Sequence, residues 1–222
     1  GICLAIYSLE GKPGDENYMK MLSANHNFNP VDIYGFGSTL WEDEDGHTYL
    51  YGSYNNYDVV VARSTTHDLD SPWEYYVCDA SGQYIWQHSY PTQEEISRSR
   101  IQETDCSMPW VFKKGDSYYM VAQSKWFGHE MYIFRSDKPY GPFIERKSLF
   151  SIPNTLDKLG PQEYGNLYMV NLHPHLSRNG ELVFSTNTDP KDFWDNFNAV
   201  GSADYYRPYF YRVYNWEKVY EE

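Results

Sequence analysis

Apolar and polar side chains alternate along several short stretches of the chain, which is the pattern of β-strands with one buried face. The alternation is clearest over residues 117–123, Ser-Tyr-Tyr-Met-Val-Ala-Gln, and over residues 181–185, Glu-Leu-Val-Phe-Ser. No long segment repeats apolar side chains at the helical period of about 3.6 residues. The pattern therefore predicts an all-β fold.

One phrase recurs three times: an apolar strand, a turn with glycine, a strand rich in Tyr, Val or Phe, and a third strand. The turn glycines Gly46, Gly115 and Gly180 lie 69 and 65 residues apart, and glycine supplies the positive φ that such hairpin turns need. Repetition at a fixed period in a β-rich chain indicates a radial or stacked array of small sheets. We expect one β-propeller domain over residues 1–222, with blade-like units at about 35–78, 105–146 and 167–216.

The alternation also predicts where the strands lie. The expected strands of the three units are 38–42, 48–54, 58–64, 73–78, 107–113, 117–124, 130–136, 143–146, 167–172, 181–186 and 205–213. Residues 2–9 form a further expected strand, and residues 16–34 are expected to be irregular. Residues 79–104 are expected to connect two units, with a short helix where Thr92 and Glu95 form a capping-box pattern.

Three units and part of another are too few to close a propeller, which usually has about four to eight blades. An open array leaves strand edges unpaired. We therefore expect another chain, or a segment missing from this sequence, to complete the ring.

Composition and charge exclude some partners. The formal net charge is −13, which opposes binding to a nucleic-acid phosphate backbone. No run of apolar residues is long enough for a membrane-spanning helix, so no membrane insertion is expected. Aromatic residues make up 18% of the chain and suit both strand packing and sugar stacking. Cys3, Cys78 and Cys106 match no metal-ligand spacing, and a disulfide or buried thiols both remain open.

Two sets of motifs resemble known propellers. Residues 171–177, Asn-Leu-His-Pro-His-Leu-Ser, with 180–185, Gly-Glu-Leu-Val-Phe-Ser, and 206–208, Tyr-Arg-Pro, resemble the C-terminal blade of a group of bacterial surface propellers. That group was long described as of unknown function and is related to the endo-D-arabinanases of glycoside hydrolase family 183. The phrases around Trp41 and Trp110 that open the first two units resemble five-bladed glycosidase propellers in general.

This resemblance covers about residues 35–216. It implies a five-bladed propeller of glycosidase type, placed outside the cytoplasm, with carbohydrate as its ligand. It also implies that the first blades, which often carry essential carboxylates in such enzymes, lie outside this sequence.

Residues that begin the innermost strand of each blade converge on the central channel of a propeller. By alignment of the repeats, these are expected to be 38–39, 105–107 and 171–173. Glycosidases need two carboxyl groups beside the scissile bond, and Glu103 and Asp105 are the acids just before an expected inner strand. They are our candidate catalytic pair, with turn capping as the alternative.

Other residues are candidates for substrate binding. Asn171, His173 and His175 could orient sugar hydroxyls, or the histidines could bond to a neighbouring blade; a zinc site wants a further close ligand that is not visible. Tyr205 and Arg207 precede the last strand, where Arg207 could clamp a carboxylate or form a buried ion pair. Trp126 could stack on a sugar, with packing inside the protein as the alternative. The acidic turn 43–46 lacks the later ligands of a calcium loop and is expected to be a solvated hairpin turn.

These observations predict a secreted, periplasmic or cell-surface propeller that acts on glycans as a glycoside hydrolase, without a cofactor or metal. One alternative is a non-catalytic carbohydrate-binding or structural component of a surface assembly. A soluble intracellular scaffold is the third. The sugar and its linkage are left open.

Overall fold

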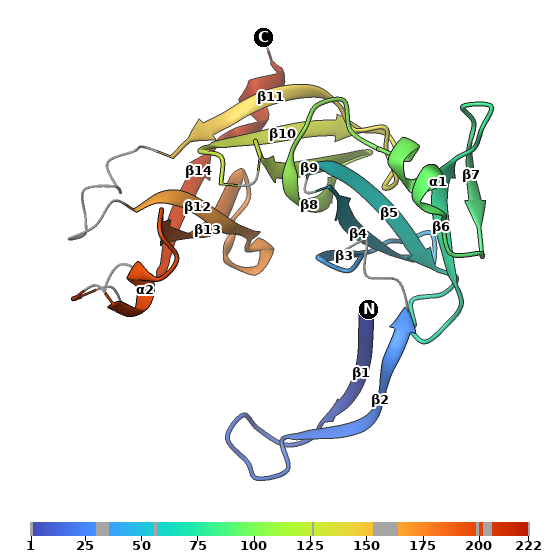
Figure 1. The fold of residues 1–222 in the computed structure, drawn as a ribbon, viewed down its shortest axis with the longest axis horizontal. Helices are drawn as coiled ribbons and strands as arrows, with labels where there is room; N and C mark the ends of the chain where they lie inside the picture. Colours follow the sequence, from blue (N-terminus) through green and yellow to red (C-terminus); the bar gives the residue numbers. More distant parts are fainter. Residues whose placement is uncertain are drawn as a thin grey trace.

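Antiparallel sheets form nearly all of the regular structure, as the alternation predicted (Figure 1). The structure is a computed structural model that describes residues 2–29, 36–55, 57–125, 127–152, 164–198, 200–201 and 206–221. Three sheets are meanders whose strands follow one another in space as they do in sequence, and the fourth is a hairpin.

We call the three meanders the first, second and third blades. The first blade contains β3 (Thr39–Glu42), β4 (Thr48–Tyr54), β5 (Asp58–Ser64), β6 (Trp73–Cys78) and β7 (Tyr84–Gln87). The second contains β8 (Ser107–Lys114), β9 (Ser117–Gln123), β10 (Glu130–Ser136) and β11 (Ile144–Ser151). The third contains β12 (Tyr164–Leu172), β13 (Glu181–Pro190) and β14 (Pro208–Tyr214). The hairpin contains β1 (Ile2–Leu9) and β2 (Met19–Asn29).

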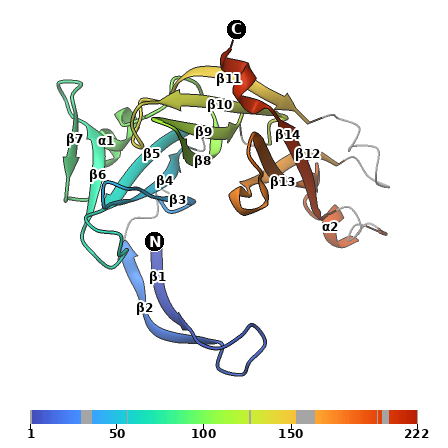
Figure 2. The ribbon, with the colours of Figure 1, turned by 180° about the vertical axis from the view of Figure 1, so that it is seen from behind.

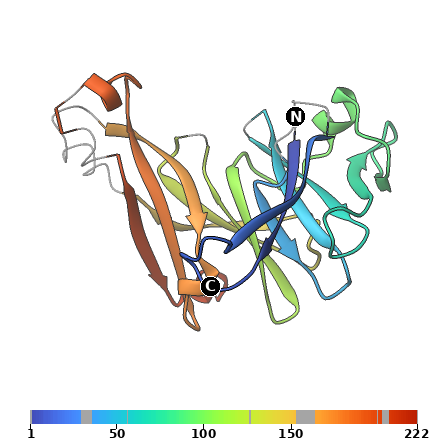
Figure 3. The ribbon, with the colours of Figure 1, turned by 90° about the horizontal axis from the view of Figure 1, so that it is seen from below.

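The blades stand side by side in an arc, and the hairpin projects away from them (Figures 1, 2 and 3). Their innermost strands are β3, β8 and β12, and the recurrent glycines lie in the turn that follows each of these strands. Gly46, Gly115 and Gly180 have φ of 92°, 59° and 75°, so the expected left-handed turn conformation is confirmed at all three.

Short helices connect the sheets. The helix α1 (Gln93–Arg98) begins at Thr92, whose side chain and that of Glu95 form the expected capping box. A second helix, α2 (Asp195–Asn198), lies in the insertion between β13 and β14, and 3₁₀ turns occupy Pro174–Leu176 and Trp216–Tyr220. In the described part of the chain, no helix is long and apolar enough to cross a membrane.

Two strands differ from expectation. Residues 19–29, expected to be irregular, form β2, and β7 lies in the segment expected to connect two units. The remaining expected strands of the blades are found, with ends that differ by a few residues.

The core consists of apolar side chains that are buried between the faces of neighbouring blades. Between the first and second blades, the buried side chains include Tyr49, Tyr51, Met120 and Phe134. Between the second and third blades, Val121, Ile133 and Phe184 pack together with Trp216 from the last 3₁₀ turn. A third cluster lies on the other face of the first blade, under Ile96 of α1. Each blade is therefore held by the apolar surface that it shares with its neighbour.

The acidic turn of the first blade is not solvated throughout, contrary to expectation, because Asp43 is only 4% exposed. The Tyr118 hydroxyl of β9 donates to its carboxylate at 2.9 Å, and the Trp41 indole Nε1 donates to it at 3.0 Å. Burial and this carboxylate raise the pKa of Tyr118 to about 12. A buried carboxylate is tolerated only with such donors, so Asp43 ties the first blade to the second.

We expect Tyr118→Phe to lower the free energy of unfolding by about 1–3 kcal/mol, because it removes one donor from a buried carboxylate. Urea denaturation at neutral pH measures this change. Tyr214→Phe, at a hydroxyl on an exposed ring, is the matched control and should change stability by less than about 0.5 kcal/mol. Equal effects of the two substitutions would contradict the role given to Asp43.

Candidate functional site

The connector between the first and second blades positions the most distinctive polar cluster of the molecule. Gln102 takes the place of a strand residue beside β5: its Oε1 accepts from the Val59 backbone N–H at 2.9 Å, and its Nε2 donates to the Tyr57 carbonyl at 2.7 Å. The backbone N–H groups of Ile101 and Cys106 donate to the carbonyls of Val59 and Tyr57. These bonds hold residues 101–106 against the beginning of β5.

As a result, one carboxylate from the first blade and one from the connector contact the same arginine. Arg100 Nη1 lies 2.8 Å from Asp105 Oδ1 and 3.2 Å from Asp58 Oδ1. Because both oxygens contact the same nitrogen, they lie no more than about 6 Å apart. The Arg100 Nε donates to the Gln102 carbonyl at 2.7 Å, which fixes the guanidinium in place. We call Asp58, Arg100 and Asp105 the carboxylate cluster.

The two carboxylates differ in their surroundings. The Asp58 side chain is 23% exposed, whereas that of Asp105 is 65% exposed. Burial raises the pKa of Asp58, the nearby Asp105 charge raises it further, and Arg100 acts in the opposite direction. Carboxylates that share a site but differ in environment are suited to different roles in catalysis.

An aromatic pocket of about 120 Å³ has Arg100 in its lining. Tyr76, Tyr84 and Tyr140 form its walls, and the ring of Tyr76 lies 5.1 Å from that of Tyr84 and 5.0 Å from that of Tyr140. The Tyr84 hydroxyl donates to the Arg100 carbonyl at 2.6 Å. Ile101 and Pro142 complete the lining. Tyrosine rings around a polar group are a surface on which a sugar could stack.

Cys106 is next to the carboxylate cluster in sequence but is not suited to nucleophilic chemistry. Its side chain is fully buried, and burial raises the pKa of the thiol. Only the thiolate is strongly nucleophilic. Cys3, Cys78 and Cys106 are all free thiols.

The two acids that the sequence proposed as a pair have different partners in the structure. Asp105 joins the carboxylate cluster, whereas Glu103 Oε1 accepts from the Arg146 backbone N–H of β11 at 2.6 Å. Both side chains are exposed. The acid that lies beside Asp105 is therefore Asp58, which sequence reasoning missed. It begins a third strand rather than an inner strand, and no local motif links it to residue 105.

The expectation that residues 171–173 begin the inner strand of the third blade is wrong, because β12 ends at Leu172. His173 and His175 thus lie near the turn glycine. His173 Nε2 lies 2.8 Å from Ser185 Oγ, and the two histidine rings are 5.8 Å apart. Burial and the neighbouring His175 lower the pKa of His173. Asn171 pairs with Ser185 across the ladder. These three residues form a separate cluster from the carboxylates.

Among the other expected binding residues, Arg207 is not brought to the carboxylate cluster either. Arg207 lies over the ring of Tyr209, 5.5 Å from its centroid. Trp126 and Tyr205 lie outside the described residues. Within the described ranges, no group of three or more His, Cys, Asp or Glu side chains could hold a metal ion.

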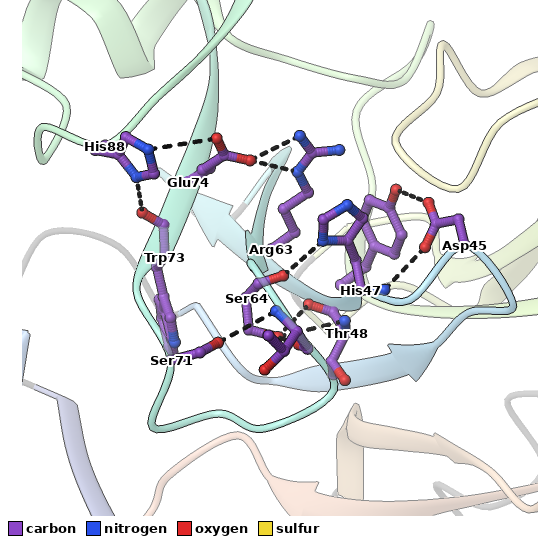
Figure 4. Close-up of polar contacts among 11 residues, drawn as sticks. Asp45, His47, Thr48, Arg63, Ser64, Ser71, Trp73, Glu74 and His88 are labelled. Atoms are coloured by element: carbon purple, nitrogen blue, oxygen red, sulfur yellow. Dashed lines mark hydrogen bonds and ion pairs between the residues drawn. The ribbon is translucent and has the colours of Figure 1, made fainter.

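A second polar network links the outer strands of the first blade (Figure 4). The Arg63 Nε and Nη2 each lie 2.7 Å from Glu74 Oε2, and the guanidinium lies 4.1 Å from the centroid of the Trp86 ring. His88 Nε2 is 3.6 Å from Glu74 Oε1. Since Arg63 engages Glu74 and stacks on Trp86, this network holds β5, β6 and β7 together, and we give it a structural role.

Comparison with known proteins identifies the family. The family described as "Domain of unknown function (DUF5005)" matches residues 1–216. The chain belongs to this family. Among curated proteins, no match is found.

Two solved structures are similar to this DUF5005 chain. The crystal structure of a "putative hydrolase" from Bacteroides ovatus ATCC 8483 is 60% identical, with a TM-score of 0.92, and the match covers 99% of this chain. It covers 54% of the Bacteroides protein, so the chain spans about half the length of that relative. The α-L-arabinanase of Cellvibrio cellulosa, solved with arabinohexaose, is 14% identical with a TM-score of 0.50, over 94% of this chain and 63% of that one. The DUF5005 chain shares the propeller fold of this glycoside hydrolase.

In the DUF5005 chain, we expect Arg100→Gln to raise the pKa of Asp58, because Arg100 is the charge that lowers it. We expect Asp105→Asn to lower the same pKa, because it removes a negative neighbour. NMR titration of the side-chain carboxyl carbon follows both shifts, with Asp70→Asn as a control at a distant exposed acid. Shifts in the same direction for Arg100→Gln and Asp105→Asn would contradict the cluster.

Proposed function

We propose that this chain carries the catalytic site of a glycoside hydrolase that cleaves a polysaccharide, and that it works at the cell surface, in the periplasm or after secretion. One observation carries the proposal: Asp58 and Asp105 contact the same arginine, beside a pocket walled by three tyrosines. Two carboxyl groups at short range are what glycoside hydrolysis requires. The fold shared with an arabinanase and the description of the Bacteroides relative support the same class.

The environments of the two acids suggest their roles. Burial favours the protonated form of Asp58, which is the form a general acid needs in order to donate a proton to the leaving oxygen. Asp105 is more exposed and would attack the anomeric carbon to form a glycosyl-enzyme ester. Asp58, then deprotonated, would take a proton from the water that hydrolyses the ester. Arg100 holds the two carboxyl groups close despite their repulsion.

The substrate is proposed as an arabinose polymer. Residues 171–177, 180–185 and 206–208 resemble a group related to endo-D-arabinanases, and the protein that shares the fold is described as an α-L-arabinanase. Both arabinans are therefore the first polysaccharides to test. Tyr76, Tyr84 and Tyr140 would stack on a sugar ring beside the cleaved bond.

One observation favours a second candidate, a carbohydrate-binding propeller without catalysis. The Arg100 guanidinium contacts both carboxylates directly, so it occupies space that a scissile bond would need. In that case the tyrosine pocket would bind glycan and the acids would only fix Arg100. Binding of an arabinan without release of reducing ends would identify this function.

We expect Asp58→Asn and Asp105→Asn each to lower kcat on the cleaved arabinan by about 10²-fold or more, because each removes one of the two carboxyl groups. Release of reducing sugar measures the rate. Glu94→Gln, at a highly exposed acid of α1, is the matched control and should leave the rate unchanged. Loss of activity in Glu103→Gln, with Asp58→Asn active, would instead support the pair proposed from sequence.

We expect the reaction to retain the anomeric configuration. The Asp58 and Asp105 oxygens are no more than about 6 Å apart, whereas inverting enzymes separate their carboxyl groups by about 6.5–9.5 Å to admit a water. Proton NMR of the first product formed reads the configuration before mutarotation. An inverted product would exclude Asp105 as the nucleophile.

A further inference from the structure

Two buried polar side chains of the second blade each have an atom without a hydrogen-bond partner. Ser107, the first residue of β8, is 1% exposed, and Gln123, the last residue of β9, is 0% exposed. Within the described residues, neither Ser107 Oγ nor Gln123 Oε1 has a partner. Because a buried polar atom without a partner is costly, two such atoms in one place point to a bound molecule that pairs with them.

The two side chains lie on the same face of the blade. Ser107 is directly opposite Gln123 in the β8–β9 ladder, and side chains at such positions have Cβ atoms about 4.5–5.5 Å apart. A β-bulge follows, because the ladder next pairs Trp110 with Val121 and so has one more residue on β8 than on β9. Met108, inside the bulge, has a left-handed φ of 54°. The extra residue keeps Ser107 and Trp110 on one face of the strand.

That face lies between the second and third blades, both of which belong to the described chain. Met131, which pairs with Gln123 on its other side, is part of the apolar cluster at this junction. Gln123 Nε2 donates to the Leu167 carbonyl of β12 at 2.6 Å, and Trp110 Nε1 donates to the Val170 carbonyl at 3.1 Å. The two unpaired atoms are thus surrounded largely by apolar side chains, where a missing hydrogen bond costs most.

The orientation of the Gln123 amide is fixed. Its Nε2 donates to two backbone carbonyls, those of Gly128 and Leu167, each at 2.6 Å. If the amide were turned over, its oxygen would face these two carbonyl oxygens, and none of the three can donate. Gln123 Oε1 therefore keeps its place and requires a donor. The Ser107 hydroxyl is able to donate but makes no hydrogen bond to it.

The chemistry of the two atoms identifies the bound molecule. It must donate to Gln123 Oε1 and accept from Ser107 Oγ, and it must be small, because both side chains are at most 1% exposed. A divalent metal ion does not suit the site, since within the described ranges no group of three or more His, Cys, Asp or Glu side chains could hold one. We propose that a single buried water molecule bridges Ser107 Oγ and Gln123 Oε1.

This water connects the second blade to the third. It bonds the first residue of β8 to the last residue of β9, and the amide of that last residue also bonds to Leu167 of the third blade. The junction of the second and third blades thereby has a polar connection, as the junction of the first and second blades has in Asp43. Buried waters that pair with otherwise unpaired groups are costly to remove.

A crystal structure of the unsubstituted chain, at a resolution that shows ordered waters, is the first test. We expect one water peak within hydrogen-bond distance of both Ser107 Oγ and Gln123 Oε1. A direct hydrogen bond between these two atoms, or no density between them, would overturn the proposal. A monovalent cation in place of the water would also overturn it; the midpoint of urea unfolding would then change when sodium or potassium chloride is replaced by choline chloride.

A pair of substitutions tests the same water in solution. Threonine and valine have nearly the same shape, but only threonine carries a hydroxyl. We expect the equilibrium constant of unfolding, measured by urea denaturation, to be about tenfold or more larger for Ser107→Val than for Ser107→Thr, because valine removes one partner of the water. The same two substitutions at Ser148, an exposed serine of β11, are the matched control and should differ by less than about twofold.

The sign of the difference at residue 107 decides the outcome. If the Ser107 hydroxyl were buried without a partner, valine would be at least as stable as threonine there, because an unpaired buried hydroxyl is costly. A Ser107→Val variant as stable as Ser107→Thr, or more stable, therefore contradicts the bridging water. If either variant does not fold, the crystal structure of the unsubstituted chain decides the question alone.

Discussion

The structure depends on the burial of blade faces against one another. A single meander of three to five strands has two faces, and in this chain both are rich in aromatic and branched side chains. The face that carries Tyr49 and Tyr51 is sealed by the second blade, and the face that carries Ile133 is sealed by the third. Removal of this apolar surface from water is the dominant favourable term. Each blade is therefore stable only through its neighbours. The polar contacts between blades then fix how the blades are aligned.

Two sets of such polar contacts lie at the junction of the first and second blades. Asp43 accepts hydrogen bonds from Tyr118 of the next blade, and Gln102 bonds along the free part of β5, where β6 no longer pairs with it. Gln102 satisfies strand backbone groups that would otherwise be buried without partners. The same bonds set the place of Arg100 and Asp105. The geometry of the candidate site therefore depends on the hydrogen bonds by which the connector pairs with β5 of the first blade.

The sequence was informative wherever a strand has one buried face. Alternation predicted β9 and β13, the recurrent glycines predicted the inner turns, and Thr92 with Glu95 predicted the start of α1. It failed for β2, where the described side chains of residues 19–26 are exposed except for the half-buried Ala24, so the strand has no reason to alternate. It also failed for β7, whose four residues include three consecutive large apolar side chains.

The site was harder to predict than the fold, because it rests on contacts between distant residues. Asp105 was a candidate for its place before an inner strand, which is a local property. Its partner Asp58 is identified only once the connector is seen to lie along β5. The histidines were misplaced because alignment of the repeats took residues 171–173 as the start of an inner strand, whereas β12 ends at Leu172 and His173 follows it.

The carboxylate cluster depends on one junction of the arc. Asp58, Arg100 and Asp105 come only from the first blade and its connector to the second, and the tyrosine pocket is built from the same two blades. The relative position of the two acids therefore depends on how the connector packs along β5 and on the Arg100 contacts, and none of the three residues of the cluster belongs to the third blade.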